Sequence, residues 1–238
     1  KEIEIYDLFK TLIIILKKLC DKNIYHLDIK PDNILVNKNT KEIKLADFGL
    51  ACSKDKMKKT ACGTRGYIAY EVLKDIKISC KADVFSMGAT LYKLLTEKRI
   101  YEDYISYSKN PFPYYQKAFN NILNLDMKYL DYGMIITDMI AIHPEDRPTP
   151  TELLRRIKQI GNEEQDEEEN QKYDKKNDID ILSYIENMME DYDEDFYDSK
   201  KEFVEELINE YKHTRKINNL ENKDIKKIED KYNLKLSN

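Results

Sequence analysis

The chain has 238 residues, of which 41% are hydrophobic and 36% are charged, a balance that predicts a soluble protein with one substantial domain and smaller additions. Its formal net charge of −5 hides an asymmetry, because residues 161–238 carry 24 acidic and 13 basic residues whereas residues 1–160 are net positive by 6. Positive charge suits phosphate-bearing ligands, but it is diffuse and no nucleic-acid-binding motif accompanies it, so we expect no nucleic-acid partner.

The first predicted element is a helix over residues 2–19. Its centre is apolar on every side, which is the pattern of a helix buried in a protein interior. The apolar run is too short to cross a bilayer, so we expect no membrane partner.

A β-hairpin is predicted next. Residues 34–36 form a short apolar run, residues 37–40 are polar and turn-prone, and residues 42–46 alternate between polar and apolar. This hairpin would place Asn33 and Asp47 at neighbouring ends of one ribbon, where both side chains can reach one metal ion. The alternative interpretation is an ordinary hairpin flanked by surface aspartates.

Helices dominate the rest of the first 160 residues. A loop is expected at residues 110–113, because each proline there disfavours a helix before it. The predicted helices span residues 82–97, 115–123 and 128–142, and a last helix follows Pro148 and ends near Gly161.

The composition changes after residue 160. An acidic run at residues 163–169 predicts a solvated linker over residues 161–176. Three amphipathic stretches follow within residues 177–238, and we expect them to form marginal helices or to stay partly disordered, because acidic repulsion and sparse apolar residues leave little core. This acidic tail could dock on the preceding domain or bind a separate protein partner.

Four cysteines, at positions 20, 52, 62 and 80, show no C-x-x-C spacing. With only three histidines in the chain, this arrangement predicts free thiols rather than a zinc site. Free thiols and the lack of a recognisable secretion signal favour a reducing intracellular compartment, the cytoplasm or the nucleus.

The predicted hairpin is preceded by the motif His26-Leu27-Asp28-Ile29-Lys30-Pro31-Asp32-Asn33 and followed by Asp47-Phe48-Gly49. Phosphoryl transfer needs a carboxylate that orients the attacking hydroxyl, a cation near the moving phosphate, and oxygen ligands for Mg²⁺. Asp28 can be the carboxylate and Lys30 the cation. Asn33 and Asp47 can supply the side-chain oxygens that Mg²⁺ prefers. In this order and at this separation, H-x-D-x-K-P-x-N and D-F-G resemble the catalytic and metal-binding loops of eukaryotic protein kinases.

Three later segments resemble the same family. Residues Gly63–Glu71 are similar to the G-T-x-x-Y-x-A-P-E end of a kinase activation segment, with Tyr70 in place of proline. Residues Asp83–Gly88 are similar to D-V-W-S-x-G, with Phe85 in place of tryptophan, and His143–Thr149 resembles the P-x-x-R-P segment. The order of these motifs across about 120 residues argues against coincidence.

The resemblance implies a Ser/Thr protein kinase that uses ATP and Mg²⁺ to phosphorylate a protein substrate. It implies that Asp28 and Lys30 are catalytic, that Lys30, Asn33 and Asp47 bind the nucleotide, and that Asn33 and Asp47 hold the metal. Lys30 is the residue that Ser/Thr kinases carry two positions after the aspartate. Thr64 supports the same specificity, because its family counterpart hydrogen-bonds the catalytic aspartate and lysine.

Five other positions are implied to be structural. The residues matching Glu71 and Arg147 form an ion pair in the family, and such a pair is costly to break from one side when it is buried. The residue matching Asp83 braces the backbone of the catalytic loop. We expect His26 to pack beneath Phe48 rather than to act in acid–base chemistry.

Control by phosphorylation is left open by the sequence. Leu27 stands where most kinases have an arginine that pairs with a phosphate on the activation loop, and leucine cannot make that charge-assisted contact. Thr60 lies at a position like the usual phosphorylation site, four residues before Thr64. Four lysines within residues 54–59 could partner a phosphate on Thr60, or could simply keep this loop solvated.

The resemblance covers residues 2–160 and implies an α+β, mainly helical C-terminal lobe with a small β-hairpin. No G-x-G-x-x-G and no V-A-I-K-like strand occurs in the chain, so we expect the N-terminal lobe to be absent, either because the chain is a fragment or because the lobe was lost. Two functions stay open: a kinase whose isolated C-lobe is inactive, and a pseudokinase or scaffold that binds protein partners. Within the family, His26-Leu27-Asp28 and Ala69-Tyr70-Glu71 are similar to Wee-type kinases, whereas Gly63–Tyr67 is similar to general Ser/Thr kinases.

Overall fold

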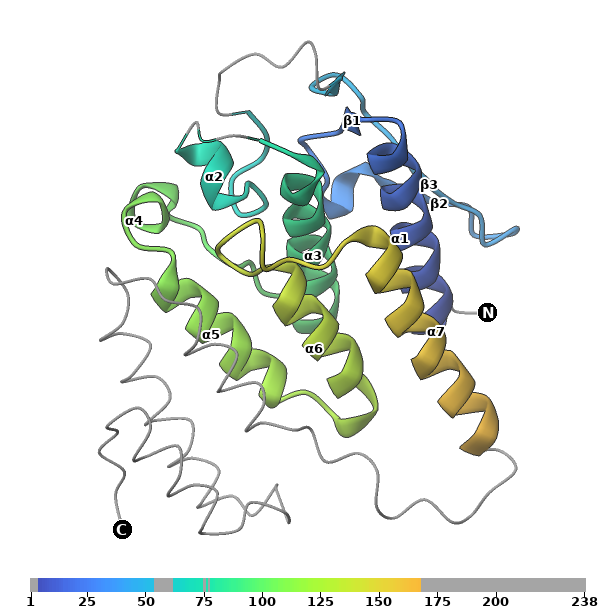
Figure 1. Cartoon of the computed structure of the whole chain (residues 1–238). Coiled ribbons are helices and arrows are strands. Elements are labelled where there is room, and N and C mark those ends of the chain that lie inside the picture. Colours follow the sequence, from blue (N-terminus) through green and yellow to red (C-terminus); the bar gives the residue numbers. More distant parts are fainter. Residues whose placement is uncertain (1–3, 54–61, 75, 77, 168–238) are drawn as a thin grey trace, which may run out of the picture. The chain divides into compact units, whose positions relative to one another are not determined.

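The computed structural model describes residues 4–53, 62–74, 76 and 78–167 (Figure 1). Three sequence predictions lie outside the described residues: the phosphorylation site at Thr60, the lysines within residues 54–59, and the tail from residue 168 onward. The described part is mainly helical and contains two small antiparallel sheets. Its elements are α1 (Ile5–Asp21), β1 (Ile24–Tyr25), η1 (Pro31–Asn33), β2 (Ile34–Val36), β3 (Ile43–Leu45), β4 (Cys52–Ser53), α2 (Tyr70–Leu73), α3 (Cys80–Thr96), α4 (Tyr104–Lys109), α5 (Phe112–Leu123), η3 (Met127–Tyr129), α6 (Leu130–Met139) and α7 (Pro150–Glu167).

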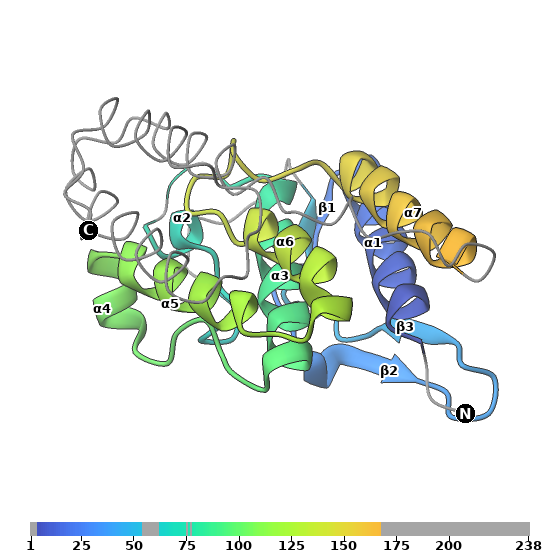
Figure 2. The ribbon, with the colours of Figure 1, turned by 90° about the horizontal axis from the view of Figure 1, so that it is seen from below.

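Helix α3 is the centre of the described part. Every residue from Ala82 to Tyr92 is buried, so this helix has no solvent-facing side over three turns. It packs against α6 and α1, while α1 and α7 lie side by side (Figures 1 and 2). Gly88 allows the close approach of α6, because a Cβ at this position would lie 2.7 Å from the Cβ of Met139.

The predicted hairpin is present as the antiparallel pair β2 and β3, in which Ile34 faces Leu45 and Val36 faces Ile43. Asn37 shapes the turn, because its side-chain oxygen accepts hydrogen bonds from the backbone N–H groups of the two residues Asn39 and Thr40. The N–H of Ala46 donates to the carbonyl of Asn33 at 2.8 Å, which extends the pairing to the end where Asn33 and Asp47 lie.

Two differences from the predicted helix boundaries have a clear physical reason. The prediction of a loop at residues 110–113 is wrong for its last two residues, because α5 begins at Phe112 and has Pro113 in its first turn. The first turn tolerates proline, since its missing N–H would have no partner within the helix anyway.

Helix α7 does not end at Gly161 but continues to Glu167, so the first part of the expected linker is helical. The glycine has a packing role instead of a stop role. A Cβ at residue 161 would lie 2.3 Å from a ring carbon of Tyr6, so the absent side chain leaves room for the Tyr6 ring of α1 against α7.

Five short elements were not predicted from the sequence: β1, η1, β4, α2 and α4. Strand β1 pairs with β4 through two residues on each side, with Tyr25 opposite Cys52. Elements of two to six residues carry too little periodicity to be recognised, because tertiary contacts rather than local pattern form them.

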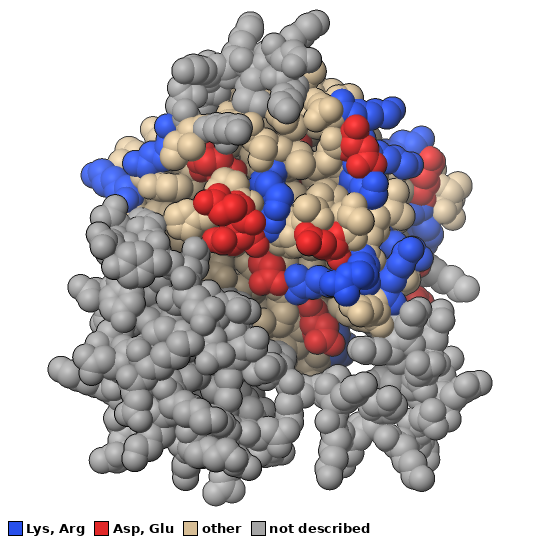
Figure 3. Space-filling model, viewed as in Figure 1, with Lys and Arg blue, Asp and Glu red and all other residues tan. Residues whose placement is uncertain are grey.

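The surface of the described part carries both signs of charge. On the face shown in Figure 3, basic and acidic side chains are interspersed rather than gathered in one basic patch. Among the described residues, no helix has the length and apolar character needed to cross a membrane.

Candidate active site

A buried carboxylate on α3 shapes the loop between β1 and η1. Asp83 accepts hydrogen bonds from the backbone N–H groups of His26 at 2.6 Å and Leu27 at 2.8 Å. Leu27 lies in the left-handed region with φ 62°, a conformation that costs a leucine about 1–3 kcal/mol. The two hydrogen bonds to Asp83 offset this strain. Burial raises the pKa of Asp83 to about 6, although both N–H donors act in the opposite direction.

Asp28 follows the strained residue and is the centre of a closed hydrogen-bond network. The hydroxyl of Thr64 donates to Asp28 Oδ1 at 2.6 Å, and Lys30 Nζ donates to Asp28 Oδ2 at 2.8 Å. Lys30 Nζ also lies 2.7 Å from Thr64 Oγ1, which closes the triangle. The structure therefore brings together a carboxylate, an ammonium group and a hydroxyl from two segments that are distant in the sequence.

The electrostatics of this network keep Asp28 ionised. Burial would raise the pKa of Asp28, but the hydrogen bonds from Lys30 and Thr64, the charge of Lys30 and a hydrogen bond from Asn33 outweigh it and hold the pKa below its ordinary value. An ionised carboxylate can accept a hydrogen bond from an incoming hydroxyl. With a low pKa it is a weak base, so it suits orienting that hydroxyl better than removing its proton early.

Asn33 is buried beside Asp28 and leaves one oxygen available. Its Nδ2 donates to the carbonyl oxygen of Asp28 at 2.8 Å and to Asp28 Oδ2 at 3.3 Å. Its amide oxygen accepts no hydrogen bond from any described residue. A buried amide oxygen without a donor is the kind of group that a hard cation satisfies.

Asp47 stands on the other side of the β2–β3 hairpin end. It is an exposed residue with φ 60°, and its Oδ1 accepts a hydrogen bond from Gly49 N at 3.2 Å. Among the described residues, no three His, Cys, Asp or Glu side chains form a group that could hold a metal ion by themselves. Asn33 and Asp47 carry the kinds of oxygen ligand that Mg²⁺ takes in sites that combine few protein oxygens with substrate phosphates.

His26 and Phe48 contact each other through their rings. The ring centroids lie 4.7 Å apart in an edge-to-face arrangement, and His26 Nε2 lies 3.1 Å from the carbonyl oxygen of Ala46. Burial lowers the pKa of His26, so the ring is neutral at pH 7, although the hydrogen bond with Ala46 opposes the shift. This geometry ties the segment after β3 to the loop between β1 and η1.

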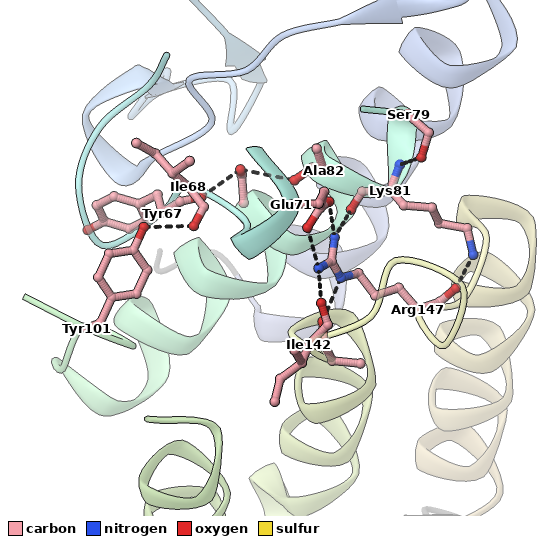
Figure 4. Close-up of polar contacts among 11 residues, drawn as sticks. Tyr67, Ile68, Glu71, Ser79, Lys81, Ala82, Tyr101, Ile142 and Arg147 are labelled. Carbon is pink, nitrogen blue, oxygen red and sulfur yellow. Dashed lines mark hydrogen bonds and ion pairs between the residues drawn. The ribbon is translucent and has the colours of Figure 1, made fainter. Parts of the chain in front are cut away.

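A second polar cluster joins Glu71 to Arg147 away from the Asp28 network. The guanidinium makes a two-point contact with the carboxylate, at 2.6 Å from Nη1 and 2.9 Å from Nη2, and both side chains are buried (Figure 4). Arg147 also donates to three backbone carbonyls, at 2.7–2.9 Å, those of Ala141, Ile142 and Lys81. This pair connects α2 with the segment between α6 and α7.

The segment that carries Thr64 is fixed by contacts that the sequence did not reveal. The hydroxyl of Ser86 donates to the carbonyl oxygen of Tyr67 at 2.7 Å, and the hydroxyl of Tyr101 donates to that of Ile68 at 2.7 Å (Figure 4). Both bonds are buried. The first bond holds the residues after Thr64 on α3, and the second holds them on the segment that follows α3. No local sequence pattern around Ser86 or Tyr101 indicates these contacts.

Gly63 is a site residue whose role sequence reasoning missed. Its φ is 116°, and a Cβ at this position would lie 2.5 Å from the carbonyl oxygen of Leu27. Only glycine fits there, because the backbone beside Thr64 must touch the backbone beside Asp28. The available signal was the glycine that directly precedes the threonine.

The family model described as the protein kinase domain matches residues 1–157. The chain belongs to the protein kinase family.

The chain matches less than half of the length of each of three similar kinases. The serine/threonine-protein kinase GE16371 of Drosophila yakuba is 34% identical over 149 residues, which cover 59% of this chain and 20% of that protein. The serine/threonine-protein kinase nekl-2 of Caenorhabditis elegans is 30% identical over 162 residues, covering 63% and 42%. The putative mitogen-activated protein kinase kinase kinase 7-like protein of Drosophila melanogaster is 33% identical over 141 residues, covering 56% and 35%. The similarity to Wee-type kinases stays a prediction.

Proposed function

We propose that this chain is the C-terminal lobe of a Ser/Thr protein kinase that transfers the γ-phosphate of ATP to hydroxyls of a protein substrate. The observation that carries the proposal is the Asp28–Lys30–Thr64 network. An ionised carboxylate, a cation and two nearby oxygen donors for Mg²⁺ are what phosphoryl transfer requires.

Each residue of the network has a distinct proposed role. Asp28 accepts a hydrogen bond from the substrate hydroxyl and aligns it for attack. Lys30 neutralises charge on the transferred phosphate. Thr64 keeps the side chains of Asp28 and Lys30 in position through its hydrogen bonds to both. Asn33 and Asp47 hold Mg²⁺, which when bound neutralises the charge of the ATP phosphates.

Exposed apolar side chains in strand β2 and in the segment after β3 support the proposal that other groups cover this part of the working enzyme. Four large apolar side chains there are exposed by 42–55%: Leu35, Val36, Phe48 and Leu50. Large exposed apolar side chains are candidates for a binding surface. We propose that the nucleotide base and an N-terminal lobe lie on this surface.

Substrate class and compartment are part of the proposal. The printed names of the relatives above support serine/threonine specificity, and Lys30 and Thr64 support it from the sequence. The four cysteines are free thiols, which supports a reducing compartment such as the cytoplasm or the nucleus. We propose no nucleic-acid and no membrane partner.

The test uses the complete natural protein and two substitutions with different expected signatures. Asp28→Asn removes the carboxylate that aligns the hydroxyl, so kcat should fall by about 10²–10⁴-fold while the KM for ATP changes little. Asp47→Ala removes a metal ligand, so the KM for Mg·ATP should rise together with a loss of kcat.

A matched control is Asp7→Asn on the exposed first turn of α1, which should leave both constants unchanged. Wild-type turnover in both site variants would overturn the role assignment. Binding of Mg·ATP without any transfer by the wild-type protein would favour the pseudokinase or scaffold instead.

A further inference from the structure

Two arginines outside the network described above lie at the turn formed by residues 64–67. The backbone N–H of Tyr67 donates to the carbonyl oxygen of Thr64 at 3.1 Å, which closes the turn. Gly66 is its third residue and has φ 91°, at the position where one class of β-turn requires a positive φ. Arg65 therefore stands at the corner of a compact turn, directly after the threonine whose hydroxyl closes the hydrogen-bond network of the site.

An aromatic ring of α4 holds Arg65 in place. The guanidinium lies over the ring of Tyr104, with its central carbon 4.3 Å from the ring centroid. This contact attracts the cation electrostatically and restrains a long, exposed side chain. A restrained guanidinium loses less conformational freedom when it binds an anion, and its N–H groups form a planar fork that matches carboxylates and phosphates.

Arg99 reaches the same turn from the segment after α3. A Cβ at Gly66 would lie 3.2 Å from Cδ of Arg99, so the glycine leaves room for the stem of the arginine against the backbone of the turn. The guanidinium carbon of Arg99 lies 5.9 Å from the centroid of the Tyr67 ring, and this side chain is exposed as well. The turn thus brings together two cations from segments that are distant in the sequence.

Neither guanidinium forms an ion pair with a carboxylate of the described residues. Three exposed acidic residues are in this region: Asp32, Glu102 and Asp103. Asp103 is occupied at the start of α4, where it accepts hydrogen bonds from the N–H of Ile105 and the hydroxyl of Ser106. These carboxylates reduce the positive potential at the turn without neutralising either arginine by contact.

We propose that Arg65 and Arg99 form an anion-binding subsite that selects protein substrates with an acidic or phosphorylated side chain close to the acceptor hydroxyl. The inference rests on the proposed function, in which Asp28 aligns that hydroxyl. An extended peptide advances about 3.5 Å per residue, so its side chains one to three positions from the acceptor lie within about 10 Å of it. Arg65 is within this reach, because it follows Thr64, whose hydroxyl lies 2.6 Å from Asp28.

The first experiment measures kcat/KM of the complete natural protein for serine peptides that differ at one of the three positions on each side of the serine. Each position carries in turn glutamate, glutamine, lysine or phosphoserine in an otherwise neutral sequence. At one or more positions glutamate should exceed lysine by about 5- to 20-fold, because two exposed ion pairs each contribute modestly. Phosphoserine above glutamate would identify phosphorylated substrates, and the reverse order acidic ones. Equal values for glutamate and lysine, or a preference for lysine, would overturn the subsite.

Variants assign the preference to the two arginines. Arg65→Gln and Arg99→Gln should each lower the glutamate-to-lysine ratio by about two- to fivefold, through the KM for the acidic peptide and not the KM for ATP. Arg65→Lys should fall between wild type and Arg65→Gln, since it keeps the charge but loses the planar fork.

Lys109→Gln is the matched control, because it removes one exposed positive charge from the end of α4, away from the turn. It should leave the glutamate-to-lysine ratio unchanged. An unaltered ratio in both arginine variants, or an equal fall in Lys109→Gln, would show that the selectivity does not come from the turn. Both arginines are exposed, so their variants should unfold within a few degrees of the wild-type temperature.

Peptide binding without ATP separates this inference from the proposed catalysis. Fluorescence anisotropy of labelled glutamate and lysine peptides on the complete natural protein should show tighter binding of the glutamate peptide, and the difference should narrow at high ionic strength. Selective binding without any phosphate transfer would refute the kinase function and keep the anion subsite. Transfer to serine with equal binding and equal turnover of both peptides would refute the subsite and keep the kinase function.

Discussion

At the scale of single residues, the site depends on hydrogen bonds made to Asp28 from two directions. Lys30 is two residues away in the same loop, whereas Thr64 comes from a distant segment. The family motif predicted which residues these are. It could not predict the left-handed backbone of Leu27 and Asp47, because tertiary hydrogen bonds and not local propensity hold a residue in that conformation.

Replacing Thr64 by alanine should raise the pKa of Asp28. The variant loses the hydroxyl that donates to Oδ1, while the burial that raises the pKa stays. Carbon-13 NMR titration of the Asp28 carboxyl group measures the change, and Thr64→Ser is the control because it keeps a hydroxyl. An unchanged pKa in Thr64→Ala would show that this hydroxyl does not stabilise the carboxylate.

The same change has a defined effect on acid stability. Because the pKa of Asp28 in the folded protein is below its ordinary value of 3.8, its ionised form stabilises the fold above pH 3.8, and this contribution is lost as the pH falls through the lower, folded-state pKa. Thr64→Ala reduces that contribution. The difference in unfolding free energy between wild type and variant should therefore shrink on acidification through this window.

At the scale of elements, periodic pattern predicted the long helices well and their ends less well. Helices α1 and α3 begin and end within a few residues of the prediction. The glycine at 161 misled the prediction of the end of α7, because a glycine signals both a helix stop and a close contact, and only the position of Tyr6 decides between them. The ends of such elements depend on partners that are distant in the sequence.

The buried pair of Glu71 and Arg147 should dominate the stability of the contact between α2 and the segment before α7. Glu71→Ala leaves a buried guanidinium without its counter-charge, so the free energy of unfolding should fall by about 3–5 kcal/mol. Urea denaturation of the purified chain measures this loss.

The exposed pair of Glu42 and Lys44 provides the control for the same substitution. Both side chains are more than half exposed, so Glu42→Ala should cost about 0–1 kcal/mol. Equal losses of unfolding free energy in the two variants would show that burial does not determine how much the Glu71–Arg147 pair stabilises the fold.

At the scale of the whole molecule, the sequence predicted a mainly helical fold with one small hairpin, and the described residues have it. The motifs single out Asp28, Lys30, Asn33 and Thr64, and the structure joins these four side chains by hydrogen bonds. Their catalytic and binding roles stay predictions. The roles of Ser86 and Tyr101 could not be predicted from the sequence, because they depend only on the backbone carbonyls to which these hydroxyls donate.

The 238-residue chain by itself should transfer no measurable phosphate from ATP. It contains neither a glycine-rich phosphate loop nor a strand lysine in the expected motif, and positioning of ATP supplies most of the rate in phosphoryl transfer. A radiolabel assay with the purified chain and a mixture of protein substrates measures this. Robust labelling would show that these residues are sufficient to align the nucleotide.

We propose above that the Asp28 network directs phosphate from ATP to Ser/Thr hydroxyls. The most direct measurement incubates the complete natural protein with γ-labelled ATP, Mg²⁺ and protein substrates, and identifies the labelled amino acid after hydrolysis. We expect label in phosphoserine and phosphothreonine, and its loss in Asp28→Asn. Label confined to phosphotyrosine, or undiminished label in Asp28→Asn, would contradict it.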